Sequence, residues 1–216
     1  MPKIIEVKKN VLAKNDEIAA RLRQTFAKAG VTVLNLVSSP GAGKTALLVK
    51  TLTDLKERFR MGVIEGDQRT ANDAERIAAT GAPVVQINTL SACHLDASMV
   101  ETALPEVDLH GLDFLFIENV GNLVCPAGYD LGEAMKVVVM STTEGEDKPV
   151  KYPKMFRVSS AVVLTKTDLL PHLDFDADAA MACARSVNPA LVPFRLSVKS
   201  GEGLAQWYDW LAALRR

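Results

Sequence analysis

Short apolar runs separated by helical stretches are the main pattern of this 216-residue chain. The runs are apolar at successive positions, as expected of strands that are covered on both faces by helices. They span residues 31–37, 62–64, 84–87, 114–117, 137–140, 161–164 and 191–194. Their alternation with helical segments predicts an α/β fold, a three-layer, doubly wound, mostly parallel sheet flanked by helices.

The helical segments carry apolar residues three or four positions apart, so that one face is apolar. Residues 15–29 predict an amphipathic helix that begins with Asn15 or Asp16 as its cap. Residues 48–59 predict a second one. We expect one domain over residues 1–216, with residues 1–30 as an N-terminal helical extension.

A glycine-rich segment, Ser38-Ser39-Pro40-Gly41-Ala42-Gly43-Lys44-Thr45, lies between the first apolar run and a predicted helix. This context predicts a P-loop, in which glycines let backbone N–H groups turn towards a phosphate at a helix N-terminus. We therefore predict nucleotide contacts from Gly41, Ala42, Gly43, Lys44 and Thr45. Lys44 would reach the β- and γ-phosphates in a catalytic role, and the Thr45 hydroxyl would bind Mg²⁺. Ser38 stands where the pattern expects glycine, so the loop is a variant.

Two later segments favour guanine over adenine. Thr165-Lys166-Thr167-Asp168 follows an apolar run and resembles the Asn/Thr-Lys-x-Asp element of GTPases. Guanine presents two adjacent N–H donors that one carboxylate accepts, so Asp168 is the predicted specificity residue, with the Lys166 stem along the base. The alternative for Asp168 is a helix N-cap.

The second of these segments is Ser197-Val198-Lys199, after the last apolar run. It resembles the Ser-Ala-Lys element whose backbone N–H meets guanine O6. Together with Thr165, Lys166 and Asp168, these three residues predict GTP and GDP as ligands.

Acidic residues at strand ends predict the Mg²⁺ side of the site. Glu118 ends the run 114–117, as a Walker-B acid does, and would hold Mg²⁺. The Gly121 N–H would sense the γ-phosphate, and Asp67 would orient water or ligands of the ion. Lys44, Asp67 and Glu118 are the predicted catalytic residues. The alternative for each acid is a helix cap or an exposed turn.

Composition narrows the class of partner. Hydrophobic residues make up 48% of the chain and the formal net charge is −1, which favours neither nucleic acid nor an anionic membrane. No apolar run approaches the roughly 20 residues that span a bilayer, and the first residues lack a signal-peptide core. We expect a cytoplasmic protein, in which three cysteines are not disulfides.

Cys93, His94 and Cys125 are candidate metal ligands, because two thiols and an imidazole suit Ni²⁺ or Zn²⁺. Three ligands leave a coordination position open for transfer or for a second subunit. Cys125 lies four residues after Gly121, so nucleotide and metal are predicted to be coupled. The alternative is that these are buried apolar cysteines, which is our expectation for Cys183.

Together these residues resemble the nickel-inserting GTPases of hydrogenase maturation, which are related to the urease nickel chaperone. The resemblance covers residue 15 onwards and includes the stretches 38–45, 65–68, 93–94, 118–126 and 145–149. It implies a GTPase that forms a GTP-dependent homodimer, with Cys93, His94 and Cys125 binding Ni²⁺ or Zn²⁺ at the interface. It also implies transfer of nickel to the hydrogenase large subunit and places Lys148 near the interface.

Some members of that family carry an N-terminal Cys-x-x-Cys-Gly-Cys motif or a His-rich stretch, whereas residues 1–30 here hold neither Cys nor His. We therefore expect an accessory protein to deliver the nickel. Slow intrinsic turnover is expected because no arginine finger is evident, with Arg69 as a candidate without support.

Three alternatives remain open. The urease chaperone carries Cys-Pro-His, whereas Ala127 follows Cys125-Pro126 here. A cobalamin-enzyme chaperone would not need the Cys93-His94 pair. A non-enzymatic metal-binding module would not need the phosphate and guanine elements.

Overall fold

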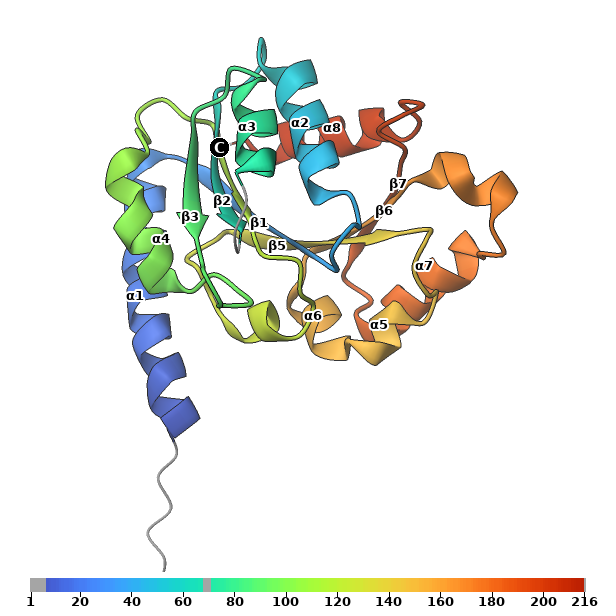
Figure 1. The fold of residues 1–216 in the computed structure, drawn as a ribbon, viewed down its shortest axis with the longest axis horizontal. Coiled ribbons are helices and arrows are strands. Elements are labelled where there is room, and N and C mark those ends of the chain that lie inside the picture. The colour runs from blue at the N-terminus through green and yellow to red at the C-terminus, as the bar shows by residue number, and fades with distance from the viewer. Residues whose placement is uncertain (1–6, 68–70, 216) are drawn as a thin grey trace, which may run out of the picture.

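A seven-stranded, entirely parallel sheet forms the centre of the molecule (Figure 1). The computed structural model describes residues 7–67 and 71–215, so Arg69 lies outside the described residues. The strand order is β3-β2-β4-β1-β5-β6-β7. The strands are β1 (Thr32–Ser38), β2 (Met61–Asp67), β3 (Val84–Asn88), β4 (Phe114–Glu118), β5 (Met135–Ser141), β6 (Ala161–Thr165) and β7 (Val192–Arg195).

Helices cover both faces of the sheet, which confirms the predicted three-layer α/β fold (Figure 1). One face packs against α2 (Lys44–Leu55), α3 (Asn72–Ala78) and α8 (Leu204–Leu214). The other face packs against α1 (Val7–Ala29), α4 (Ala97–Ala103), α6 (Pro153–Val158) and α7 (Ala177–Val187), with α5 (Lys148–Lys151) beside α7. Within the described residues, no helix is long and apolar enough to cross a membrane.

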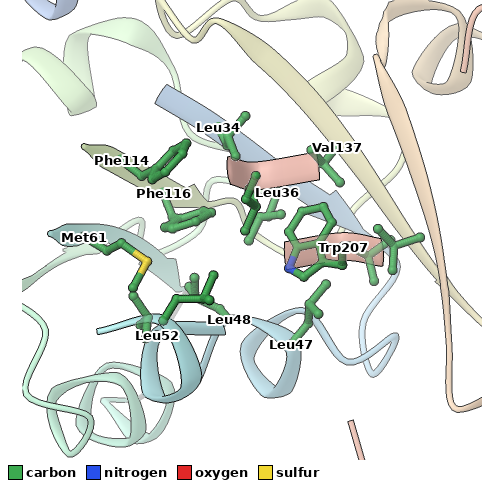
Figure 2. Close-up of a cluster of buried hydrophobic side chains, with 14 of the residues drawn as sticks. Leu34, Leu36, Leu47, Leu48, Leu52, Met61, Phe114, Phe116, Val137 and Trp207 are labelled. Carbon is green, nitrogen blue, oxygen red and sulfur yellow. The ribbon is translucent and has the colours of Figure 1, made fainter. Parts of the chain in front are cut away.

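The larger core lies between β1, β4 and the helices α2 and α8 (Figure 2). Alternate residues of β1 and β4, such as Leu34 and Phe116, meet the α2 face that carries Leu48. Trp207 of α8 closes this core, and its indole N–H donates to Thr51 Oγ1 at 3.0 Å. The burial of this helix face anchors α2, whose first residue is the P-loop lysine.

The apolar runs predicted all seven strands to within two or three residues at each end. The N-terminal helix differs from the prediction, because α1 already includes Val7 and Asn15 lies within it. Asn15 is therefore not a cap. Its side chain accepts a hydrogen bond from the Ala97 N–H at 2.9 Å and donates to the Asp130 carbonyl, also at 2.9 Å. These partners are distant in sequence, and the local pattern did not reveal them.

All seven strands run in the same direction, so the segments that follow them emerge at one edge of the sheet. The P-loop follows β1, Glu118 ends β4, and the 165–168 segment follows β6. The loop between β3 and α4, residues 89–96, contains Cys93 and His94 and is called the Cys-His loop below. The topology therefore brings the candidate nucleotide and metal residues to the same edge.

Candidate nucleotide site and metal-ligand cluster

The P-loop has the backbone that its glycines predict. Gly41 and Gly43 have φ angles of 74° and 93°, in the left-handed region that favours glycine. Ser38 ends β1 and is not among the residues with positive φ, so serine is accommodated without strain. The Lys44 ammonium donates to Ser38 Oγ at 2.9 Å, so the serine that replaces glycine holds the lysine.

Glu118 lies directly beside the P-loop helix. Thr45 Oγ1 donates to Glu118 Oε1 at 2.7 Å, whereas the buried Glu118 Oε2 accepts no hydrogen bond from the described residues. Burial raises the pKa of Glu118 and lowers that of Lys44, and each charge partly offsets the shift of the other. A hydroxyl and a carboxylate with an unpaired oxygen are the donors that Mg²⁺ prefers, so this pair fits the ion.

Glu65 is a member of this site to which the sequence analysis gave no role, although the stretch 65–68 contains it. It faces Glu118 across the β2–β4 pairing and is 3% exposed, with Oε2 lacking a hydrogen-bond partner among the described residues. Burial and the neighbouring Glu118 raise the pKa of Glu65 to about 8. The signal available in the sequence was a carboxylic acid directly after the apolar run 62–64.

A cavity of about 450 Å³ opens above Lys44, Thr45 and Glu118. Its lining also includes Asp67, Gly121, Glu65, Asp73 and Arg76. Arg76 forms an ion pair with Asp73 at 2.9 Å. A Cβ on Gly121 would lie 3.0 Å from the Pro40 backbone, so this glycine permits the close approach of its segment to the P-loop. The structure thus brings the predicted phosphate-side residues together.

The predicted base-recognition residues meet on the other side of the P-loop. Thr165 Oγ1 donates to the Ala42 carbonyl at 2.6 Å, and Lys166 Nζ donates to the Gly41 carbonyl at 2.8 Å. Lys166 has a φ of 59° and precedes a short 3-10 helix, Thr167–His172. Asp168 therefore lies inside this turn and is not its cap.

The segment after β7 supplies the other predicted base-recognition residues. Ser197 Oγ donates to Asp168 Oδ1 at 2.6 Å and accepts from the Lys199 N–H at 3.2 Å. The Val198 side chain packs against the larger core, so only the backbone of Val198 would take part in recognising the base. Ser197 is thus a defined partner of the Asp168 carboxylate, and none of these base-side residues lines the cavity above Lys44.

Cys93, His94 and Cys125 lie together, each about half-buried, although Cys93 and Cys125 are 32 residues apart. Their candidate ligand atoms all lie within 4.8 Å of one another. The two Sγ atoms are 3.0 Å apart as free thiols, and Cys93 Sγ is 3.6 Å from His94 Nδ1. Cys183 lies half-buried on α7, so it is not the core residue that we expected.

The chemistry of this cluster fits a thiophilic divalent ion. Bonds of about 2.3 Å to sulfur and 2.0 Å to nitrogen would link three such atoms with small side-chain adjustments. The hydrogen bond to Cys125 raises the pKa of the Cys93 thiol, so binding would displace protons. Burial lowers the pKa of His94, which favours the neutral imidazole that metals bind. The Tyr129 ring packs against His94 with centroids 4.0 Å apart.

Comparison with known proteins identifies the family. Residues 32–193 match the model of the CobW/HypB/UreG nucleotide-binding domain. The chain is 55% identical over 213 residues to hydrogenase maturation factor HypB of Escherichia coli strain K12. The match covers 99% of this chain and 73% of that protein. This chain belongs to the HypB family of hydrogenase maturation factors.

Two solved HypB structures share the fold. HypB from Helicobacter pylori in complex with nickel is 42% identical, with a TM-score of 0.87 and coverage of 93% of this chain and 94% of that one. HypB from Archaeoglobus fulgidus is 34% identical, with a TM-score of 0.88 and coverage of 94% and 98%. The resemblance inferred from the motifs is therefore confirmed.

Lys148 of this HypB-family chain contacts the P-loop. Its ammonium donates to Ser39 Oγ at 2.9 Å and lies 3.7 Å from Glu144 Oε2. The start of α5 is thus attached to the loop that would bind the phosphates.

Proposed function

We propose that this chain is a GTP-hydrolysing nickel metallochaperone, in which GTP binding and hydrolysis control Ni²⁺ binding, homodimerisation and nickel insertion into a hydrogenase large subunit. The observation that carries the proposal is the 118–125 segment. It begins at Glu118, bonded to Thr45 of the P-loop, and ends at Cys125, one of three clustered metal ligands. One short stretch of backbone therefore joins the phosphate side of the nucleotide site to the metal-ligand cluster.

GTP and GDP would bind across the P-loop. The backbone of Gly41, Ala42 and Gly43 would surround the phosphates, and Lys44 would compensate their charge. Asp168 would accept the two guanine N–H groups. The Ser197–Val198–Lys199 backbone would meet guanine O6, with Thr165 and Lys166 bracing this side of the loop.

Hydrolysis would convert GTP and water into GDP and phosphate. Mg²⁺ held by Thr45 and Glu118 would neutralise charge on the phosphates. Lys44 would stabilise the charge that develops on the transferred phosphoryl group, and Asp67 would orient the attacking water. Among the described residues that line the cavity, the arginine is Arg76, and it is paired with Asp73. We expect slow intrinsic turnover because no arginine finger is evident.

Nickel would bind to Cys93, His94 and Cys125, with Zn²⁺ as the competing ion. Three protein donors leave a coordination position for a transfer partner or a second subunit. Two large apolar side chains beside the ligands support a homodimer interface here, since Leu90 is 71% exposed and Val124 is 63% exposed. An accessory protein would deliver the ion, and the hydrogenase large subunit would receive it.

The test is a titration of Ni²⁺ into nucleotide-free, GDP-bound and GTP-analogue-bound protein. Light scattering measures the molar mass in each state and so reports dimerisation. We expect nickel affinity and dimerisation to change with the nucleotide, and nickel binding to collapse in Cys93→Ala and Cys125→Ala. Cys183→Ala is the matched control and should behave as the wild type. Weak nickel binding that ignores the nucleotide and survives both substitutions would refute the proposal.

A further inference from the structure

Two consecutive residues at the end of β4 contact opposite sides of the sheet. The Glu118 carboxylate bonds to Thr45 of α2, on the face of the larger core. The Asn119 side chain bonds to the Leu95 N–H at 3.1 Å, and Leu95 belongs to the core on the other face. The Asn119 N–H donates to the Leu36 carbonyl at 3.0 Å and so extends the sheet. A displacement of β4 at its end would therefore reach both faces.

Three asparagines that are distant from the Cys-His loop in the sequence connect it to other segments. Asn119 Oδ1 accepts from the Leu95 N–H at 3.1 Å, and Asn122 Nδ2 donates to the Cys93 carbonyl at 3.2 Å. Asn15 Oδ1 accepts from the N–H of Ala97, the residue after the loop, at 2.9 Å. Two of these contacts come from the segment beside the nucleotide cavity, whereas the third comes from α1.

A chain of buried polar groups continues behind Asn119. Its Nδ2 donates to Asn35 Oδ1 at 3.4 Å, and Asn35 Nδ2 donates to Glu133 Oε1 at 3.1 Å. Glu133 pairs with Lys136 at 2.8 Å, with side chains 6% and 8% exposed. Because these groups are buried, a rearrangement that broke one bond would leave a costly unpaired donor or acceptor.

This chain returns to the metal ligands. Lys136 Nζ donates to the Tyr129 carbonyl at 2.9 Å, and the Tyr129 ring packs against His94. The Cys-His loop is therefore contacted at Leu95 by Asn119 directly and at His94 by the far end of the same network. Asn119 lies at the point where this network meets the nucleotide cavity.

We propose that Asn119 is a positioning residue that transmits the state of the nucleotide site to the Cys-His loop. Cys125 is carried by the segment that contains Asn119, but Cys93 and His94 lie on a separate loop and need a noncovalent link to it. The hydrogen bond from the Leu95 N–H to Asn119 supplies one such link, beside the one from Asn122 to the Cys93 carbonyl, and it is the one that starts at the nucleotide cavity. The inference rests on the proposed function, because it assumes that nickel affinity depends on the nucleotide.

The decisive experiment compares Asn119→Ala with Asn15→Ala. Both variants remove a side-chain acceptor from a backbone N–H in or next to the same loop, but only Asn119 is attached to the nucleotide side. We measure the nickel dissociation constant with saturating GDP and with a saturating GTP analogue, and take the ratio. We expect a ratio of about fivefold or more in the wild type. It should fall towards unity in Asn119→Ala and stay within about twofold of the wild type in Asn15→Ala.

The outcomes separate this inference from the proposed function. If the wild type itself shows no nucleotide-dependent ratio, the coupling in the proposed function fails, and the role of Asn119 fails with it. If the wild-type ratio is present and Asn119→Ala retains it in full, only the inference fails. If Asn15→Ala loses the ratio as completely as Asn119→Ala, general loosening of the loop explains the effect and the inference is overturned.

A second measurement uses only the wild-type protein. Amide hydrogen exchange of Leu95 in the wild-type protein should differ between the GDP and GTP-analogue states, although Leu95 does not line the nucleotide cavity. Equal protection of Leu95 in both states would overturn the inference. Thermal unfolding and GDP affinity of each variant verify that it is folded and saturated with nucleotide.

Discussion

Leu95 occupies the space beside Gly66 in which a Cβ would stand. A Cβ on Gly66 would lie 2.7 Å from Leu95 Cγ and 2.8 Å from both of its methyl carbons. Gly66 lies in β2 between Glu65 and Asp67, which both line the nucleotide cavity. The Cys-His loop therefore packs directly on the back of the strand that serves the nucleotide site.

Gly66→Ala should lower the free energy of unfolding by about 1–3 kcal/mol, because overpacking displaces Leu95. Alanine in place of glycine in a strand without this contact would instead stabilise by about 0.5–1 kcal/mol, so the sign of the change is informative. Urea unfolding measures it.

Gly145→Ala is the matched control for Gly66→Ala. A Cβ there would meet within 4 Å only the Asp147 carboxyl group, the end of an exposed side chain that is paired with Lys151. A Gly66→Ala protein as stable as the wild type would show that Leu95 does not hold this position.

Asp168→Asn should exchange guanine preference for xanthine preference. The asparagine side chain offers an N–H donor that faces the amino group of guanine but matches the C2 carbonyl of xanthine. We expect GDP affinity to fall by about 10- to 100-fold, the equivalent of one or two lost hydrogen bonds to a charged group. Competition between fluorescent GDP and XDP measures the exchange.

The control for Asp168→Asn is Asp174→Asn, because Asp174 is an exposed carboxylate in the same connection between β6 and α7. It should leave GDP and XDP binding unchanged. If Asp168→Asn binds GDP as tightly as the wild type, Asp168 does not read the base.

The contribution of Glu65 to the stability of the nucleotide-free protein should fall as pH rises from about 4.5 to about 8. The folded pKa of Glu65 is raised to about 8 from its ordinary 4.5, so in this window the folded protein binds a proton that the unfolded chain has lost. Raising the pH therefore favours unfolding. Glu65→Gln should weaken this dependence and be more stable than the wild type at pH 8.

The measurement is denaturant unfolding of the Glu65→Gln and wild-type proteins at pH 5.5, 7 and 8.5, without nucleotide and with a chelator. Glu57→Gln, at an exposed position, should retain the wild-type pH dependence. Parallel stability profiles for Glu65→Gln and the wild type would contradict the assignment of a neutral Glu65.

Lys136→Met should destabilise the fold by about 3–5 kcal/mol, because it leaves the Glu133 carboxylate buried without its cation. The double variant Glu133→Gln/Lys136→Met should recover much of this loss. Lys50→Met breaks the exposed pair with Asp54 and should cost less than about 1 kcal/mol. If Lys136→Met and Lys50→Met lower the free energy of unfolding by the same amount, the buried Glu133–Lys136 pair has no special role in stability.

The parts of the nucleotide site that could be predicted from sequence depend on local chemistry. Gly41 and Gly43 adopt the backbone that their spacing predicts, and Lys44 and Thr45 begin the helix that follows. The cluster of Cys93, His94 and Cys125 was predicted from residue types and from the strand ends they follow, and the ligand atoms do lie together.

The contacts missed by sequence reasoning connect residues that are far apart in the chain. Asn15 appears in the sequence as a helix cap, yet α1 begins earlier and Asn15 binds Ala97, 82 positions away. Asn119 binds Asn35 across 84 positions. Neither asparagine stands in a pattern that differs from an ordinary turn or cap, so only the folded chain reveals its partner.

The sequence by itself determined the parallel sheet, the P-loop and the chemical types of the ligands, because strand periodicity, glycine backbone freedom and side-chain donor chemistry act over a few residues. The tertiary structure alone decided that Glu65 faces Glu118, that Leu95 packs on Gly66, and that Asn119 joins the end of β4 to the Cys-His loop. These relationships arise from strand order and register, which bring distant segments together at one edge of the sheet. They follow from how the whole chain packs its two cores, and no short stretch of residues encodes them.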